Sequence, residues 1–195
     1  DVDESTVTDR ALNGGTITNT EAQSVEVALK ARKVLTGATT LLSDWDDGNG
    51  KTPFVFTLTV PNNTNYTDSK TVPATGAQNE TVTVAGTDKI ASTQTVTFDT
   101  LRFKAFAENN GASTAIYLVD ANGNKLNTAP NSLGTLTNGT LDVAFTVTEA
   151  ALTPVPEGLT QPSAQTVTLT ITQDADGTLT VTGSPEDFTV DMVNN

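Results

Sequence analysis

Three short loops hold acidic and amide side chains at a spacing that could bind a metal ion. They read DWDDGNGK at residues 44–51, DANGNK at 120–125 and DADG at 174–177. Carboxylate and amide oxygens are the ligands that Ca²⁺ prefers, but none of these loops completes an EF-hand. In the second loop, Lys125 stands where the sixth position needs Gly, and Asn131 stands where the twelfth needs Glu. All three loops lie between strand-like runs, where Asn, Asp and Gly favour hairpin turns. We therefore expect turns and no metal site.

The residues that carry most enzyme chemistry are missing. The chain has no Cys and no His, which excludes thiolate nucleophiles, imidazole bases and the usual zinc sites. Paired carboxylates and lysine-based schemes remain open, but the sequence singles out no such pair. The single Trp, Trp45, could stack on a sugar, although a lone Trp beside a strand more often anchors a core or an interface. We expect no catalytic residues, no cofactor and no enzyme activity.

Charge and composition narrow the range of partners. A net charge of −13 over 195 residues repels nucleic acid and anionic lipid. No apolar run approaches the roughly 20 residues that span a bilayer. About one residue in five is Thr, while Lys and Arg together number 10. Such a weakly charged, Thr-rich surface is typical of exported fibres and virion proteins, so we expect a secreted, extracellular protein that binds neither nucleic acid nor membrane.

The apolar residues recur with a period of two along nearly the whole chain. In TVTLTITQ, at residues 166–173, Thr residues occupy one face and Val167, Leu169 and Ile171 the other, as in a half-buried strand. Residues 114–119 are apolar on both faces, which indicates a central strand covered on both sides. Residues 21–35 could form a helix, but their alternation favours a strand. Similar alternation occurs at residues 54–60, 80–85, 94–98, 101–107, 140–147 and 178–182.

About ten such strands, separated by turn signals such as Asn-Gly at 122–123 and 138–139 and Asp-Gly at 176–177, predict an all-β fold, an Ig-like antiparallel β-sandwich. We expect the apolar residues of 140–147 and 166–173 to share one core, with the alternate Thr residues facing away. Residues 21–195 would form this sandwich, and residues 1–20 would be an N-terminal extension.

The extension contains an extended Gly-rich segment that the sandwich does not need. A free strand of this kind tends to pair with another sheet edge, and donation to a neighbouring subunit is one such use. The candidate donor residues share one face of the segment; they are Asn13, Gly15, Ile17 and Asn19. Donation could continue through the alternating residues that follow; these are Val25, Val27 and Leu29. The rival donor is the alternating C-terminal strand; its residues are Phe188, Val190 and Met192.

Three segments resemble the major pilins of the chaperone–usher pathway. NGGTIT at residues 13–18 is similar to the donor strand of these pilins, and STAIYLVDANGNKL at 113–126 to their central strand and turn. Residues 136–172 resemble their late region, in which a strand leads through a Pro- and Gly-containing loop into a final strand. The resemblance implies a structural subunit of a pilus, or fimbria, that polymerises by donor-strand exchange. It also implies assembly with a periplasmic chaperone and an usher, and a role in adhesion or biofilm formation.

Other classes of protein share this composition. A subunit of another strand-donating fibre would also be Thr-rich, free of Cys and built as a β-sandwich. A soluble carbohydrate-binding or adhesin module would stay monomeric and bind a glycan. A phage tail or decoration protein would have the composition without the donor strand.

Overall fold

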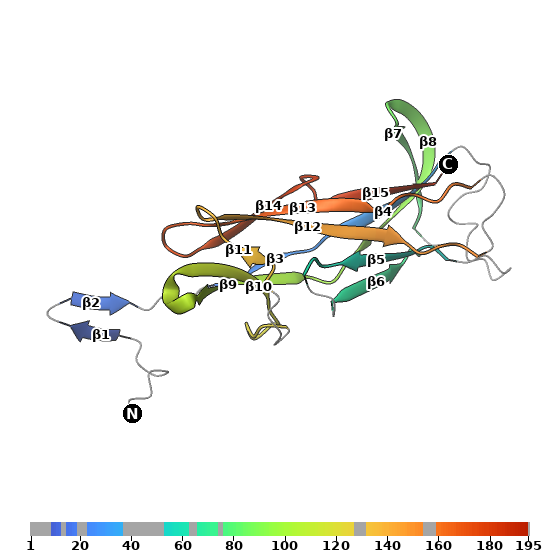
Figure 1. Cartoon of the computed structure of the whole chain (residues 1–195). Helices are drawn as coiled ribbons and strands as arrows, with labels where there is room; N and C mark the ends of the chain where they lie inside the picture. Colours follow the sequence, from blue (N-terminus) through green and yellow to red (C-terminus); the bar gives the residue numbers. More distant parts are fainter. Residues whose placement is uncertain are drawn as a thin grey trace.

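The protein folds almost entirely into β-strands (Figure 1). The computed structural model describes residues 9–12, 15–18, 23–36, 53–62, 66–73, 76–126, 132–153 and 159–194. These residues contain fifteen strands, one 3₁₀ turn at Asn109–Gly111 and no α-helix. The strands are β1 (Asp9–Leu12), β2 (Gly15–Thr18), β3 (Val25–Val27), β4 (Lys30–Thr36), β5 (Val55–Thr59), β6 (Thr67–Thr71), β7 (Gln78–Val84), β8 (Thr87–Thr97), β9 (Leu101–Glu108), β10 (Ser113–Leu118), β11 (Gly134–Thr135), β12 (Thr140–Glu149), β13 (Gln165–Gln173), β14 (Leu179–Ser184) and β15 (Thr189–Asn194). The all-β prediction is confirmed.

No helix in the described part of the chain has the length and apolar character that a membrane span requires.

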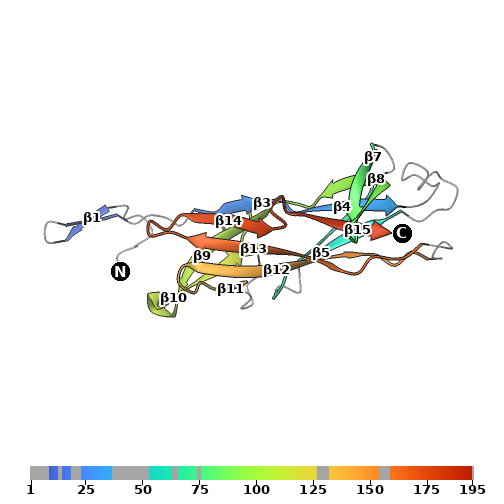
Figure 2. The ribbon, with the colours of Figure 1, turned by 90° about the horizontal axis from the view of Figure 1, so that it is seen from above.

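The strands form three sheets of a sandwich and one separate hairpin. The five-stranded sheet has the order β14-β13-β12-β5-β6, and the four-stranded sheets have the orders β11-β10-β9-β3 and β15-β4-β8-β7. β1 and β2 pair with each other in a two-stranded sheet. Figures 1 and 2 show an elongated sandwich with the β1–β2 hairpin at one end and the C terminus toward the other.

One strand pair departs from the antiparallel prediction. β15 runs parallel to β4, with Met192 opposite Lys33 and Asn194 opposite Leu35. Parallel neighbours need a long connection, and here almost the whole sandwich lies between the two strands. The predicted antiparallel β-sandwich is confirmed, and β15–β4 is the one parallel pair among the described strands.

The alternation of β12 and β13 places one apolar face in the core. Val167, Leu169 and Ile171 are fully buried, whereas Thr166 and Thr172 are exposed. Thr168 and Thr170 are half-buried, so none of the four Thr residues enters the core. The apolar residues of β12 join the same cluster, with Leu141 packed at its margin; the buried members are Val143, Phe145 and Val147. The predicted division of the two faces is confirmed.

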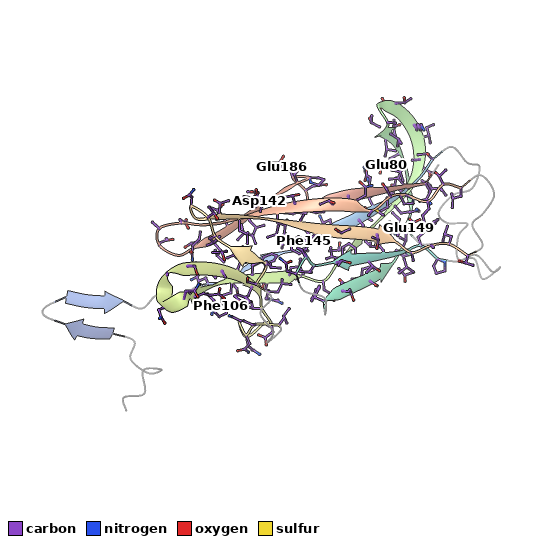
Figure 3. The ribbon with its side chains drawn as sticks, in the orientation of Figure 1. Glu80, Phe106, Asp142, Phe145, Glu149 and Glu186 are labelled. Carbon is purple, nitrogen blue, oxygen red and sulfur yellow. The ribbon has the colours of Figure 1, made fainter. Side chains whose placement is uncertain are left out.

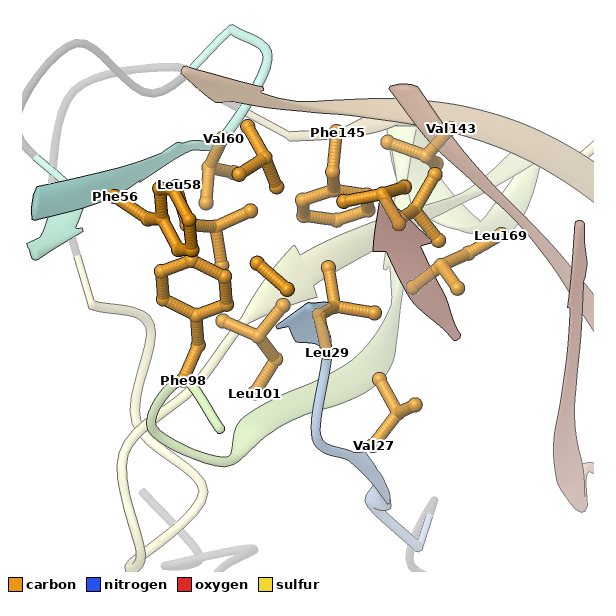
Figure 4. Close-up of a cluster of buried hydrophobic side chains, with 14 of the residues drawn as sticks. Val27, Leu29, Phe56, Leu58, Val60, Phe98, Leu101, Val143, Phe145 and Leu169 are labelled. Atoms are coloured by element: carbon orange, nitrogen blue, oxygen red, sulfur yellow. The ribbon is translucent and has the colours of Figure 1, made fainter. Parts of the chain in front are cut away.

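The core lies between the five-stranded sheet and the two four-stranded sheets (Figure 4). Phe145 of β12 meets Phe103 of β9 edge-to-face, with ring centroids 6.2 Å apart. Leu29 enters the same cluster just before β4, and Met192 enters it from β15. Because aromatic and aliphatic side chains from all three sheets fill one cluster, their burial stabilises the sheets as a unit.

Two ambiguous segments form strands. Residues 21–35 contain β3 and β4, so the strand prediction for this segment is confirmed. β10 lies between β9 and β11, and residues 115–119 are all buried, as their two apolar faces predict. The Asn138–Gly139 turn likewise behaves as expected: both residues have positive φ, and Thr137 and Thr140 exchange backbone hydrogen bonds across it.

Candidate functional site: a buried lysine, carboxylate and amide

The candidate donor residues fall in different parts of the fold. Gly15 and Ile17 lie in β2, while Asn13 and Asn19 lie outside the described residues. Val25 and Val27 form part of β3, which pairs with β9 of the same chain. Val27 and Leu29 are buried in the core of the same chain, and Val25 packs against it. Donation through these three residues would therefore remove them from their own core.

The rival C-terminal donor also lies in its own subunit. Val190 and Met192 are buried core residues of β15, and Phe188 packs against the same core. Phe188 approaches Gly183 so closely that a Cβ there would lie 2.5 Å from its ring. This strand completes the sheet of the subunit that contains it.

Three polar residues form a buried cluster at the end of the sandwich that carries the C terminus. This cluster was not identified from the sequence. Lys33 of β4, Glu149 of β12 and Asn194 of β15 come from three different strands. The side chains of Lys33 and Glu149 are 0% exposed, and Asn194 is 0% exposed as a residue. Figure 3 shows Glu149 at the end of β12, beside β5. Burial of charged groups is costly unless they are paired, so these three residues need one another.

Glu149 contacts both of the other residues. The Lys33 ammonium donates a hydrogen bond to Glu149 Oε2. Asn194 Nδ2 donates to Glu149 Oε1 over 3.2 Å. One carboxylate therefore holds the amine and the side-chain amide on its two oxygens.

The walls of the cluster are aromatic. Lys33 Nζ lies 4.0 Å from the ring centroid of Phe54 and 5.9 Å from that of Phe56. Both rings are buried, so the cluster is shielded from water. This burial lowers the pKa of Lys33 to about 8, although Glu149 acts in the opposite direction by charge and hydrogen bonding. A neutral, nucleophilic amine is therefore far more accessible here than on a surface lysine.

One atom of the cluster has no partner. Asn194 Oδ1 is buried, and no hydrogen bond to it is found within the described part of the chain. An unpaired buried carbonyl is uncommon in folded proteins and often marks a strained or reactive position. An amine, a carboxylate and a primary amide in one dry site are the groups needed to form a new amide bond.

The three residues occupy core-facing positions of their strands. In β4, Lys33 alternates with the buried residues Ala31 and Leu35. In the same way, Glu149 lies two residues after the buried Val147 of β12, and Asn194 lies two residues after the buried Met192 of β15. Each polar residue thus continues an alternating row of buried residues, which is the signal that could have identified the site.

The loops considered for calcium use their carboxylates internally. Asp120 Oδ1 accepts backbone hydrogen bonds from Asn122 and Asn124, at 2.8 and 2.9 Å. Asp176 accepts one from the backbone of Thr178. These bonds lower the pKa of both carboxyl groups. Gly123 and Gly177 have positive φ, as tight turns require. The loop at 44–51, with Trp45, lies outside the described residues.

A search among known families gives one match. The family model described as FctA, Spy0128-like isopeptide containing domain, matches residues 29–194. No match to the chain is found among curated proteins or solved structures. The matched region begins just before β4 and ends at Asn194, so it contains all three residues of the buried cluster.

Proposed function

The chain belongs to the FctA family of Spy0128-like isopeptide containing domains, and from this premise we propose that an isopeptide bond joins Lys33 to Asn194. The family is a pilin family of Gram-positive bacteria, so the chain is a structural pilus subunit. The family supports the prediction that the chain is a pilin that assembles with copies of itself into a surface fibre. The family does not specifically support assembly by a chaperone and an usher.

The observation that carries the proposal is the contact of Glu149 with both reacting groups. Neutral Lys33 Nζ attacks Cγ of Asn194, and a carbon–nitrogen bond forms. Glu149 takes a proton from the attacking nitrogen and passes it to the Asn194 amide nitrogen, which lies on its other oxygen. The bond between Cγ and Nδ2 then breaks, and one molecule of ammonia leaves. Amine and primary amide become a secondary amide, so atoms and charge balance.

The surroundings favour this reaction in three ways. Burial supplies an unprotonated amine by lowering the pKa of Lys33. The parallel pairing of β4 and β15 holds the two side chains on the same side of adjacent strands. The phenyl walls exclude the water that would compete with the amine. The reaction would occur once in each chain and would have no turnover.

The bond would tie a strand near the start of the sandwich to the last one. Everything between residues 33 and 194 would lie inside a covalent loop, which raises the free energy of unfolding by restricting the unfolded chain. This is a useful property in a fibre subunit, whose neighbours transmit load through its ends. We extend the proposal to adhesion or biofilm formation as the role of the fibre.

The N-terminal extension forms a second part of the proposal. The β1–β2 hairpin pairs with no other described strand, which favours residues 1–20 as the segment offered to another subunit. Val25, Val27 and Leu29 belong to the subunit's own sandwich, so the offered segment would end before β3. Donor-strand exchange itself stays a prediction.

Peptide mapping tests the proposed bond. Proteolysis of the purified chain should yield a branched peptide in which Lys33 is joined to Asn194, with the mass of the two parts less one ammonia. Glu149→Gln preserves the shape of the carboxylate but cannot accept the proton, so it should give two separate peptides. Separate, unmodified Lys33 and Asn194 peptides from the folded wild-type chain would refute the proposal.

A further inference from the structure

The two ends of the sandwich each carry a projecting hairpin, and the two hairpins differ. At one end the β1–β2 hairpin lies clear of the sandwich in both views. Toward the other end the β7–β8 hairpin rises away from the body near the C terminus (Figures 1 and 2). A contact between unlike patches at opposite ends is heterologous, and it generates the open filament of a fibre when its rotation does not close a ring.

The β7–β8 hairpin packs on the sheet through a small apolar cluster. Val82 and Ala91 pack on Val34 of β4 in a small apolar cluster separate from the main core, with Val84 and Val193 beside them. The two strands keep a continuous register over the seven pairs from Gln78–Thr93 to Val84–Thr87. The hairpin is thus a regular platform fixed to the sheet.

β7 has one regular edge that pairs with no strand among the described residues. It is the last strand of its sheet and, at seven residues, the longest edge strand of the three sandwich sheets as described. Other edges are covered in part, since β14 lies against β3 and β15 lies against β13. For β7, β8 is the one substantial neighbour among the described elements. An exposed regular edge is a template for strand addition.

The usual protection of such an edge is missing from β7. Natural edge strands are often blocked by proline or by free charges. β7 contains no proline, and its single charged residue, Glu80, is engaged by Arg32 at 3.1 Å and by the Thr93 hydroxyl at 2.8 Å. The partner strand also exposes Ile90 opposite Thr81, and this side chain is 79% exposed. An exposed aliphatic residue beside an unprotected edge indicates a contact surface.

We propose that the β1–β2 hairpin of one copy adds edge-to-edge to β7 of the next copy, with Ile90 at the junction. The inference rests on the proposed function as a pilus subunit and names the surface that receives the N-terminal extension. The β1–β2 hairpin is suited to this contact because its two strands are already extended and, among the described strands, pair only with each other. It also contains the apolar residues Leu12 and Ile17. Main-chain hydrogen bonds would supply the affinity, and the apolar residues would supply the register.

Cysteine cross-linking tests the contact directly, because the natural chain contains no Cys. Chains of all 195 residues with Thr16→Cys in β2 are mixed with chains carrying Thr81→Cys in β7, and the mixture is mildly oxidised. The matched control replaces Thr81→Cys by Thr71→Cys, an exposed position on β6, the edge strand of the five-stranded sheet. We expect several-fold more mixed disulfide dimer with Thr81→Cys than with Thr71→Cys. Equal yields from both mixtures, or no mixed dimer with Thr81→Cys, would overturn the proposal.

A second variant separates the contact from folding. Ile90→Lys should lower the yield of the mixed dimer several-fold without changing the melting temperature, because the side chain is mostly exposed. Leu126→Lys, at the other large exposed hydrophobic residue of the described part of the chain, serves as the control and should leave the yield unchanged. The Lys33–Asn194 bond is measured by mass in the same samples. If that bond is present and the contact is absent, this inference fails alone; if the bond is absent, the proposed function fails whatever the cross-linking shows.

Discussion

Two lysines of this chain contact carboxylates, yet their surroundings differ completely. Lys33 lies between Glu149 and aromatic rings, with its side chain 0% exposed. Lys70 of β6 contacts Asp68 at 3.0 Å and Asp99 at 2.7 Å, with its side chain 27% exposed and that of Asp99 73% exposed. Burial lowers the pKa of Lys33, whereas hydrogen bonds to the two carboxylates raise the pKa of Lys70.

The difference separates a reactive amine from a structural ion pair. A lysine whose pKa is raised remains protonated and cannot attack a carbonyl. A buried lysine with a lowered pKa supplies the free amine, and the carboxylate beside it moves the proton. Desolvation therefore determines which of the two lysines can react.

Removal of Glu149 should have the largest effect. Glu149→Ala prevents formation of the bond and leaves Lys33 buried without its partner. Loss of one member of a buried pair costs about 3–5 kcal/mol, in addition to the loss of the cross-link. Chemical denaturation should show the lowest unfolding free energy of all the variants. A wild-type denaturation midpoint for Glu149→Ala would contradict the assignment of Glu149. Glu149→Gln also removes the negative charge but fills the same space, so it separates the loss of the charge from the cavity that Ala leaves.

Asn194→Ala should have the next largest effect. It removes the proposed bond but keeps the Lys33–Glu149 pair. A covalent loop of this length is worth about 5 kcal/mol in the chain-entropy account. For a domain of this size we expect the melting temperature to fall by roughly 10–20 °C. An unchanged melting temperature, measured by calorimetry, would mean that Asn194 forms no cross-link.

The same variant should reveal the titration of Lys33. In Asn194→Ala the amine stays free, and its folded-state pKa of about 8 lies below the ordinary lysine pKa of 10.5. The unfolded chain then binds more protons between these two pH values, so the free energy of unfolding should rise with pH across that window. The rise should be on the order of 3 kcal/mol or less. In the cross-linked wild-type chain, Lys33 is part of an amide and cannot titrate, so the rise should be absent. Identical pH profiles for the wild type and Asn194→Ala would contradict the claim that Lys33 is a buried amine that reacts with Asn194.

Lys70, which is half-buried, should matter least. Lys70→Ala removes an ion pair at the surface, where such pairs are worth about 0.2–1 kcal/mol. The expected change in denaturation midpoint is small and should decrease further at high salt. A loss as large as that of Asn194→Ala would show that burial does not separate the two lysines.

The sequence was sufficient for the strands and for most of the core. The alternation in β12 and β13 predicted the buried residues, and the turn residues predicted the hairpin at Asn138–Gly139. The parallel pairing of β15 with β4 could not be predicted, because periodicity within a strand says nothing about which distant strand it meets.

The buried cluster was missed for the same reason. Lys33, Glu149 and Asn194 are far apart in sequence, and each alone is an ordinary polar residue near the end of a strand. Their positions were nevertheless informative, since each continues a row of core-facing residues such as Val143, Phe145 and Val147. A charged or amide residue at a core-facing position needs a partner, and three such positions in one Cys-free sandwich point to a common site.

The intact mass of the purified wild-type chain tests the central claim most directly. If Lys33 and Asn194 are joined, the mass will be lower than the mass calculated from the sequence by one ammonia, and Glu149→Gln and Asn194→Ala will each show their full calculated masses. A wild-type chain that is folded and has its full calculated mass would contradict the account.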